Sequence, residues 1–232
     1  MPKRIFSLGG RLQAVCDMAA GYESLCDIGC DHGLLPVWMA YKGLLKRAAA
    51  CDINSGPLKA ARRNIEAYGV SDIVETRLGS GLAPISSGEF ETLVIAGMGG
   101  LLISEILAED LSKARGFKRI VLMPHRDEAH LRQFLNASGF TIEDEAVALD
   151  GGKYYNVMKT INGDEPTFTE TEAAFGRCLI NRRDGRLIRR CEGELAAVNE
   201  RLAAIADKSR AESLLERQWL LTNTLQIMGN QE

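Results

Sequence analysis

The chain has 232 residues, of which 46% are hydrophobic and 25% are charged, a composition typical of a soluble globular protein with one sizeable domain and an appendage. Its formal net charge of −3 argues against an indiscriminate nucleic-acid binder but still allows a local basic surface. No apolar run approaches the roughly 18 residues that a membrane-spanning helix needs, and the first residues do not form a signal peptide. We therefore expect a cytoplasmic protein that does not associate with membranes. The sequence leaves its oligomeric state open: a monomer is favoured, and a dimer formed through the C-terminal helices is the alternative.

The six cysteines contain no C-x-x-C pair and lie in apolar or helical patterns, which indicates reduced thiols. A zinc site could be built from Cys26, Cys30, Cys51 and His32, but two of these residues would lie in strands. We therefore expect no metal ion.

Up to Pro166, short apolar strands alternate with helical patterns, and this rhythm predicts an α/β fold with a doubly wound parallel sheet. We expect helices over 12–20, 35–41, 57–68, 101–107 and 128–138. We expect strands over 24–28, 48–52, 73–78, 92–96, 119–123, 141–149 and 153–161. The last two strands flank Asp150-Gly151-Gly152, a hairpin signal. A parallel sheet closed by an antiparallel hairpin is the Rossmann-like arrangement of class I methyltransferases.

The composition changes after residue 163, because 19 of the 23 glycines precede Asp164. The segment 162–166 therefore predicts a boundary between a domain over 1–163 and a second domain over 164–232. In the second domain, apolar residues form two helical stripes: Leu187, Cys191, Leu195, Val198, Leu202 and Ile205, then Leu214, Leu221, Leu225 and Met228. The break near 206–209 predicts that these helices fold back as an antiparallel, coiled-coil hairpin.

The stretch from Leu25 to Gly33 predicts a strand end followed by a ligand-binding turn. Gly29 and Gly33 can adopt positive φ and let the backbone approach a ligand closely. Asp27 and Asp31 stand where a dinucleotide pyrophosphate would lie, and they would repel it. They can instead accept hydrogen bonds from the ammonium group of S-adenosylmethionine. The alternative is an ordinary strand-to-helix turn with capping aspartates.

Further candidates follow the later strands, where ligands bind in open parallel sheets. Asp52 can accept hydrogen bonds from ribose hydroxyls, although a simple turn aspartate fits as well. The loop 79–82 can close over an adenine ring. The segment 96–100 carries no acidic or amide side chain that would orient an exocyclic amine. Ring N1 of adenine needs no proton removed before attack, so a site built largely of backbone suffices for it; a tight helix-start turn is the alternative.

Several motifs together resemble the TrmK family of bacterial tRNA adenine N1-methyltransferases, which act on adenine 22. They are Asp27-Ile28-Gly29-Cys30-Asp31-His32, Gly56-Pro57, Gly81-Leu82 and Ile95-Ala96-Gly97-Met98-Gly99-Gly100. The resemblance runs from about residue 7 to the hairpin and, more loosely, through the helical tail. It implies an enzyme with S-adenosylmethionine as cofactor and tRNA as substrate. By this resemblance the cofactor pocket is lined by Asp27, Gly29, Asp31, His32, Gly33, Asp52, Ile53, Ser80, Gly81, Ala96, Gly97 and Met98.

Two positions depart from the family pattern. The family usually has an aspartate at the position of Ser80, so the usual contact to the adenine amino group is left open. The fifth strand ends in Met123-Pro124-His125, where relatives often carry Gln-Pro-Asn. Met98 and His125 are the candidate catalytic residues, and His125 either faces the target base or hydrogen-bonds a loop.

Methylation of N1 requires an unpaired Watson-Crick edge, so a structured RNA must be recognised by shape and phosphate contacts with the base flipped out. One dense basic run, with six arginines against one acid between residues 177 and 190, supplies cations for this task. A solvated helix face is the alternative. The predicted RNA-binding residues are Arg11, Arg126, Arg177, Arg182, Arg183, Arg186, Arg189 and Arg190.

The sequence therefore predicts transfer of a methyl group from S-adenosylmethionine to adenine N1 at position 22 of tRNA. One rival hypothesis is a methyltransferase for a small molecule or protein, in which the arginine run would be dispensable. Another is a non-catalytic module that binds the cofactor and RNA. An NAD enzyme is the weakest candidate, because the first loop is acidic.

Overall fold

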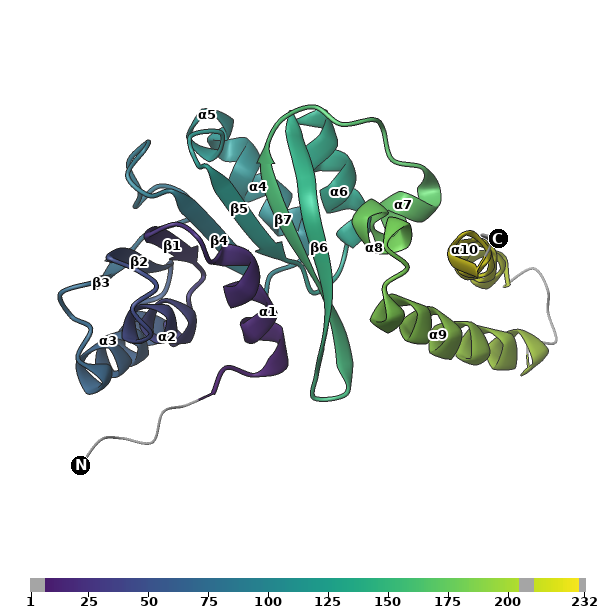
Figure 1. Cartoon of the computed structure of the whole chain (residues 1–232), viewed down its shortest axis with the longest axis horizontal. Helices are drawn as coiled ribbons and strands as arrows, with labels where there is room; N and C mark the ends of the chain where they lie inside the picture. The colour runs from purple at the N-terminus through teal and green to yellow at the C-terminus, as the bar shows by residue number, and fades with distance from the viewer. Residues whose placement is uncertain (1–6, 205–210, 230–232) are drawn as a thin grey trace.

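The computed structural model describes residues 7–204 and 211–229, and its centre is a seven-stranded sheet with the order β3-β2-β1-β4-β5-β7-β6 (Figure 1). The strands are β1 (Ser24–Ile28), β2 (Arg47–Asp52), β3 (Val74–Leu78), β4 (Thr92–Ala96), β5 (Arg119–Met123), β6 (Phe140–Asp150) and β7 (Lys153–Asn162). The first five run parallel, and β7 lies antiparallel between β5 and β6. The predicted doubly wound sheet closed by a hairpin is confirmed.

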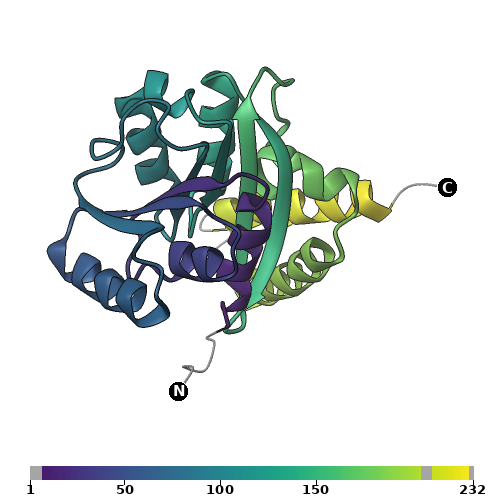
Figure 2. The ribbon, with the colours of Figure 1, turned by 60° about the vertical axis from the view of Figure 1, so that its left-hand side comes forward.

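Helices cover both faces of this sheet (Figures 1 and 2). One face packs against α1 (Gly10–Ala19), α2 (Leu34–Tyr41) and α3 (Ser55–Tyr68). The other packs against α4 (Gly100–Glu109), α5 (Leu111–Ala114) and α6 (Glu128–Ala137). Successive strand side chains point to opposite faces, so within β1 Leu25 joins the first cluster and Cys26 the second. Both faces are buried, which explains the nearly continuous apolar strands in the sequence.

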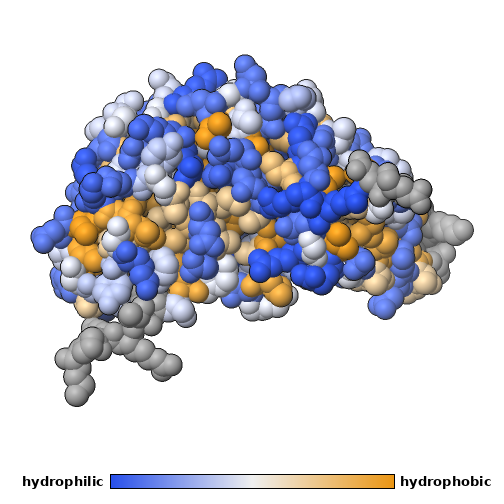
Figure 3. Space-filling model, viewed as in Figure 1, coloured by the Kyte–Doolittle hydropathy of each residue, from blue (hydrophilic) through white to orange (hydrophobic). Residues whose placement is uncertain are grey.

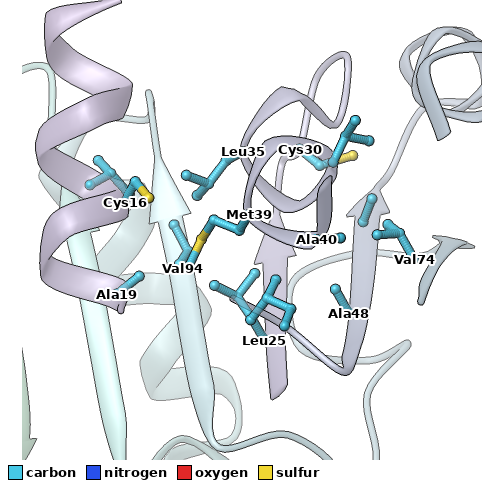
Figure 4. Packing of buried hydrophobic residues seen from close by; sticks show 14 of the residues in the cluster. Cys16, Ala19, Leu25, Cys30, Leu35, Met39, Ala40, Ala48, Val74 and Val94 are labelled. Atoms are coloured by element: carbon cyan, nitrogen blue, oxygen red, sulfur yellow. The ribbon is translucent and has the colours of Figure 1, made fainter. Parts of the chain in front are cut away.

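The first face is packed closely because β2 contributes small side chains. Ala48 and Ala50 are fully buried, and Met39 of α2 lies near Leu25 and Val94 (Figure 4). The α2 helix therefore lies close to the sheet, directly after the glycine loop. Because α2 follows the loop after β1, this packing positions that loop.

The C-terminal part consists of α7 (Glu170–Phe175), α8 (Arg177–Asn181), α9 (Gly185–Ala204) and α10 (Glu212–Gly229). The two long helices share a buried cluster that also includes Val147 of β6. Figure 1 shows α9 from the side and α10 nearly end-on, so the two helices cross steeply. The predicted pair of long helices is present, and its coiled-coil packing stays a prediction. Ile205 and the predicted break at 206–209 lie outside the described residues.

The short helices α5, α7 and α8 were not predicted, because elements of four to six residues are too short to show a helical period. The start of α7 nevertheless carries a local signal. Thr169 accepts a hydrogen bond from the Glu172 backbone N–H, and the Glu172 carboxylate accepts one from the Thr169 N–H. This capping box defines where the helix begins.

A buried ion pair joins the sheet to the C-terminal helices. Arg132 of α6 and Glu145 of β6 are almost completely inaccessible, with Nε and Oε1 2.8 Å apart. Arg132 also donates to the Ala173 carbonyl at 2.7 Å, and Glu145 accepts from the Cys178 N–H at 3.3 Å. Charges removed from water must be paired to be tolerated, so this network fixes α7 and α8 against the sheet. The proposed domain boundary at 162–166 stays a prediction.

Candidate active site

The carboxyl ends of β1, β4 and β5 surround a cavity of about 280 Å³. Parallel strands of a doubly wound sheet present their loops at this edge, where such folds bind ligands. The α1 helix closes one side of the cavity. The lining residues are Arg11, Leu12, Asp27, Gly29, Cys30, Asp31, His32, Leu34, Leu35, Ala96, Gly97 and His125.

The loop after β1 is shaped by glycine and by backbone hydrogen bonds. The N–H groups of Gly29 and Cys30 both donate to the Cys51 carbonyl, at 2.9 and 3.0 Å. Gly29 has a φ of +73°, and a Cβ on it would collide with the Met98 side chain. Met98 therefore lies across the glycine loop. A side chain at position 29 would disturb both the backbone and this contact.

Three carboxylates give one end of the site an excess of negative charge. Asp27 is buried, and its pKa is raised to about 7 by burial first and then by Asp52 and Asp31. Within the described part of the chain no donor lies within hydrogen-bonding distance of the Asp27 carboxylate. Asp52 is also buried and accepts a hydrogen bond from the Asn54 N–H at 2.8 Å. A cationic ligand group would relieve this charge excess.

The opposite end of the site is basic. The pKa of His125 is lowered by partial burial and by the charges of Arg11 and Lys153. The His125 backbone N–H donates to the Met98 carbonyl at 2.9 Å, which ties the loops after β4 and β5 together. The Arg11 side chain is also near Asp150 in the hairpin turn, with Nε and Oδ2 3.8 Å apart. The cavity thus runs from the carboxylates of Asp27 and Asp31, with Asp52 beside it, to Arg11 of α1 and the imidazole of His125.

The structure brings half of the predicted cofactor residues to the cavity. These are Asp27, Gly29, Asp31, His32, Ala96 and Gly97, and the remaining six do not line it. Asp52 and the 64% exposed Ile53 stand beside it at the same sheet edge, and Met98 covers the glycine loop.

Two predicted glycines also have local structural reasons. A Cβ on Gly33 would lie 2.9 Å from Cβ of Ala61 in α3, so Gly33 permits close helix packing. Gly81 has a φ of +49°, a backbone conformation that favours glycine. The exposed Ser80 precedes it in the same loop. Cofactor contacts by these three residues stay predictions.

Four of the six arginines in the predicted basic run are held by contacts inside the molecule. Arg177 forms ion pairs with Glu165 at 3.0 Å and with Glu172 at 2.8 Å. Arg182 pairs with Asp144 of β6 at 2.6 Å. These contacts dock the start of the C-terminal part onto the sheet. The sequence suggested an RNA track or a solvated face, and the structure adds a third explanation.

The other two of these four reach the hairpin. Arg186 donates to the Val147 carbonyl at 3.0 Å, and Arg190 donates to Oδ1 of Asn156 at 3.2 Å. Figure 3 shows strongly hydrophilic residues where α8 and the start of α9 pass the β6–β7 hairpin. Much of this polar surface therefore belongs to an internal junction.

Arg183 and Arg189 differ from the other four. Both are exposed, and neither side chain has a hydrogen bond or an ion pair among residues 7–204 and 211–229. Arg189 lines a groove of about 510 Å³ between α9 and the hairpin turn, together with Lys153, Tyr154 and Arg190. Glu194 also lines it, and its carboxylate is paired with Arg217 at 2.6 Å. Arg126 is 81% exposed and lies near Asp127, at 3.5 Å. These cations remain available to a phosphate backbone.

The sequence interpretation missed Lys153 and Tyr155. Both belong to β7, far along the chain from the glycine loop, and no spacing rule connects them to it. The hairpin signal was recognised, but its side chains were not assigned to the site. Their position follows only from the antiparallel insertion of β7 beside β5.

Burial favours the protonated form of the cysteine thiols, and the described residues form no metal centre. Burial raises the pKa of the Cys30 thiol far above its usual value and that of Cys51 to about 12. No disulfide joins the six cysteines, all of which are described. Among the described residues no three His, Cys, Asp or Glu side chains gather closely enough to hold a metal ion. None of the helices in that part of the chain is long and apolar enough to cross a bilayer.

Comparison with known proteins bears on this site. A methyltransferase-domain family model matches residues 8–158. The chain is 34% identical over 157 residues to the tRNA (adenine(22)-N(1))-methyltransferase of Bacillus subtilis. That alignment covers 68% of this chain and 66% of the relative, so it spans just under two thirds of the relative's length.

Solved structures agree with the sequence comparison. A Streptococcus pneumoniae protein, described as "a putative tRNA (m1A22) methyltransferase", matches with a TM-score of 0.88 at 28% identity, over 94% of this chain and all of that one. The same protein in complex with S-adenosyl-L-methionine gives a TM-score of 0.86. The B. subtilis m1A22 tRNA methyltransferase TrmK matches with a TM-score of 0.81 at 28% identity, over 94% and 99% of the two chains.

Proposed function

Since this chain belongs to the methyltransferase-domain family and, within it, to the TrmK family, we propose that it transfers a methyl group from S-adenosylmethionine to N1 of adenine 22 in tRNA. We further propose that it acts as a monomer in the cytoplasm. The observation that carries this proposal is the charge arrangement of the cavity, which Asp27 and Asp31 line after β1 and Arg11 lines on the α1 side.

The residues of the acidic end fit S-adenosylmethionine. Asp27 is a buried carboxylate that lacks a donor among the described residues, and it faces a cavity it shares with Asp31. The ammonium group of the ligand would supply the missing donor and positive charge. Asp52, one strand farther along the sheet, would accept hydrogen bonds from the ribose hydroxyls. Ile53 and the loop carrying Ser80 would flank the adenine ring.

The residues at the end of β4 suit attack by a ring nitrogen. When bound, S-adenosylmethionine supplies an electrophilic methyl group on a sulfonium centre. Adenine N1 presents a lone pair and needs no base, so the backbone of Ala96 and Gly97 only has to align the reactants. The lowered pKa of His125 favours its neutral form, which adds no positive charge beside an adenine ring that becomes cationic on methylation.

The tRNA would be bound through phosphate contacts on the basic side of the cavity. We propose that Lys153, Arg183 and Arg189 provide these contacts, together with Arg11 and Arg126. Lys153 and Arg189 line the groove beside the hairpin turn, Arg183 is exposed just before α9, and none of the three has an acidic partner within the described residues. Contacts of this kind are not sequence-specific and weaken steeply with salt. The other four predicted arginines, Arg177, Arg182, Arg186 and Arg190, primarily hold the helices in place.

The deciding experiment is transfer of labelled methyl from S-adenosylmethionine to unmodified tRNA transcripts. A transcript with adenine at position 22 is compared with one in which guanine replaces it. We expect label on the first transcript only. Label on both transcripts would mean that the methylated base lies elsewhere in the tRNA. Label on neither, with cofactor binding intact, would favour a small-molecule or protein substrate or a non-catalytic role.

A further inference from the structure

Two aromatic rings stand at the basic end of the cavity. The ring centroids of His125 and Tyr155 are 5.4 Å apart, and the ring planes are inclined by 58°. The β5–β7 ladder pairs Leu122 with Met158 in antiparallel register, so the residues that follow β5 lie beside the start of β7. The pair therefore belongs to the same sheet edge as the cavity, two strands away from the carboxylates of β1.

His125 brings this pair to the cavity on the β4 side. His125 itself lines the cavity, and a Cβ on Gly97 would lie only 3.8 Å from the imidazole Nε2 and Cε1 atoms. The absence of a side chain at position 97 leaves the imidazole edge open to the cavity. A planar ligand entering here would meet backbone on one side and aromatic rings on the other.

The two rings are held differently. Tyr155 is half-buried and packs against the cluster formed with α1, so the structure restrains its ring. His125 is exposed. A restrained aromatic side chain beside a more open one can receive a flat ligand without a large loss of side-chain entropy, because a tyrosine ring has only two rotatable angles.

The charges around the rings define the ligand class. Arg11 and Lys153 both act on His125. The carboxylates of Asp27, Asp31 and Asp52 lie at the far end, and Asp150 in the hairpin turn is near the Arg11 side chain. A planar aromatic group attached to an anionic backbone fits aromatic rings flanked by cations, and a nucleotide of an RNA strand has this chemistry. The cofactor, with its cationic groups, is favoured at the other end.

We propose that Tyr155 is a base-stacking residue, and that it and His125 receive the extruded target base of the RNA. This inference rests on the proposed tRNA methyltransferase function and names the residue that holds the base at the site. Stacking of a base on an aromatic side chain contributes to binding regardless of which base is present. Tyr155 therefore acts on alignment of the base, and not on cofactor binding.

The test compares Tyr155→Leu and Tyr155→Phe in methyl transfer to the tRNA transcript with adenine at position 22. We expect Tyr155→Leu to lower kcat/KM for tRNA by about 5- to 150-fold, the range that loss of one stacking contact produces. Tyr155→Phe keeps the ring and should stay within about twofold of the wild type. Both variants should bind S-adenosylmethionine as tightly as the wild type.

Tyr41→Leu is a matched control, because it removes one ring of another aromatic pair, Tyr41 and Tyr68, with centroids 5.8 Å apart and far from the cavity. It should leave kcat/KM unchanged. If Tyr155→Leu does not fold, Tyr155→Met, which fills a similar volume without a ring, takes its place. Unchanged kcat/KM in the ring-less variant, or an equal loss in Tyr155→Phe, would overturn the stacking role. Absence of methyl transfer by the wild type would overturn the proposed function itself.

Discussion

Replacing Asp27 by asparagine should stabilise the protein without cofactor and weaken cofactor binding. The carboxylate is buried, has no donor among the described residues and lies near two other carboxylates. Asparagine keeps the shape and removes the charge. The same substitution is therefore expected to raise the free energy of unfolding and to weaken cofactor binding.

The magnitude follows from the pKa of Asp27, which is about 7 in the folded protein against a usual value of 3.8. Below pH 3.8 both the folded and the unfolded chain hold the proton, and the group has no effect on stability. As the pH rises from there to 7, the unfolded chain ionises first, so the folded state loses stability. At 1.36 kcal/mol per pH unit, the loss is about 2 kcal/mol at pH 5 and about 4 kcal/mol at pH 8.

Urea unfolding of the protein without cofactor at pH 5 and pH 8 measures this effect. The free energy of unfolding of Asp27→Asn should exceed that of the wild type by about 2 kcal/mol more at pH 8 than at pH 5. Calorimetry at pH 8 should show S-adenosylmethionine binding weakened by about 10- to 100-fold, because a charged hydrogen bond is lost. Asp31→Asn, on the exposed part of the same loop, is the control and should change stability little. A pH-independent difference would refute the argument.

Four further substitutions test other parts of the structure. Gly29→Ala, at a φ of +73°, should lower the thermal midpoint and abolish cofactor binding, as calorimetry would show; unchanged binding would contradict the tight glycine turn. Arg132→Met should reduce the free energy of unfolding in urea by about 3–5 kcal/mol, because it leaves Glu145 buried and unpaired; a smaller loss would mean that water reaches the site. Arg189→Ala should reduce the slope of the logarithm of the tRNA binding constant against the logarithm of the salt concentration by about one, without changing the thermal midpoint. Arg186→Ala should instead lower the midpoint, since it removes the contact to the β6 carbonyl, and the opposite pattern would reverse these assignments.

The sheet could be predicted from the sequence because its signals are local. The strands β1, β4 and β5 have the predicted bounds, since each is a short apolar run that ends in a turn signal. The cavity residues on the loop from Asp27 to His32 were found for the same reason: their chemistry and spacing lie within one turn. The function was inferred from the joint occurrence of such motifs.

Other features could not be predicted, because their causes lie far apart in the chain. The arginine run looks uniform in sequence, but Arg182 meets Asp144 and Arg190 meets Asn156 only after β6 and β7 are in place. In the same way, Tyr155 lies beside His125 because a strand inserts between β5 and β6. Residue type and spacing alone do not distinguish an arginine that is exposed to solvent from one whose contacts to the sheet hold a helix in place.

Successive side chains of β7 point to opposite faces of the sheet, so this one strand contributes to both the cavity side and the contact with the C-terminal helices. Tyr155 points to the α1 side of the sheet, while Tyr154 and Asn156 contact the C-terminal helices on the other side. Consecutive residues in a strand are about 3.3 Å apart. The geometry of β7 therefore fixes the distance between the cavity and α9. The reach from one to the other cannot be tuned by lengthening a linker. Any change of reach requires a change of register in this strand, which would turn every one of its side chains to the opposite face.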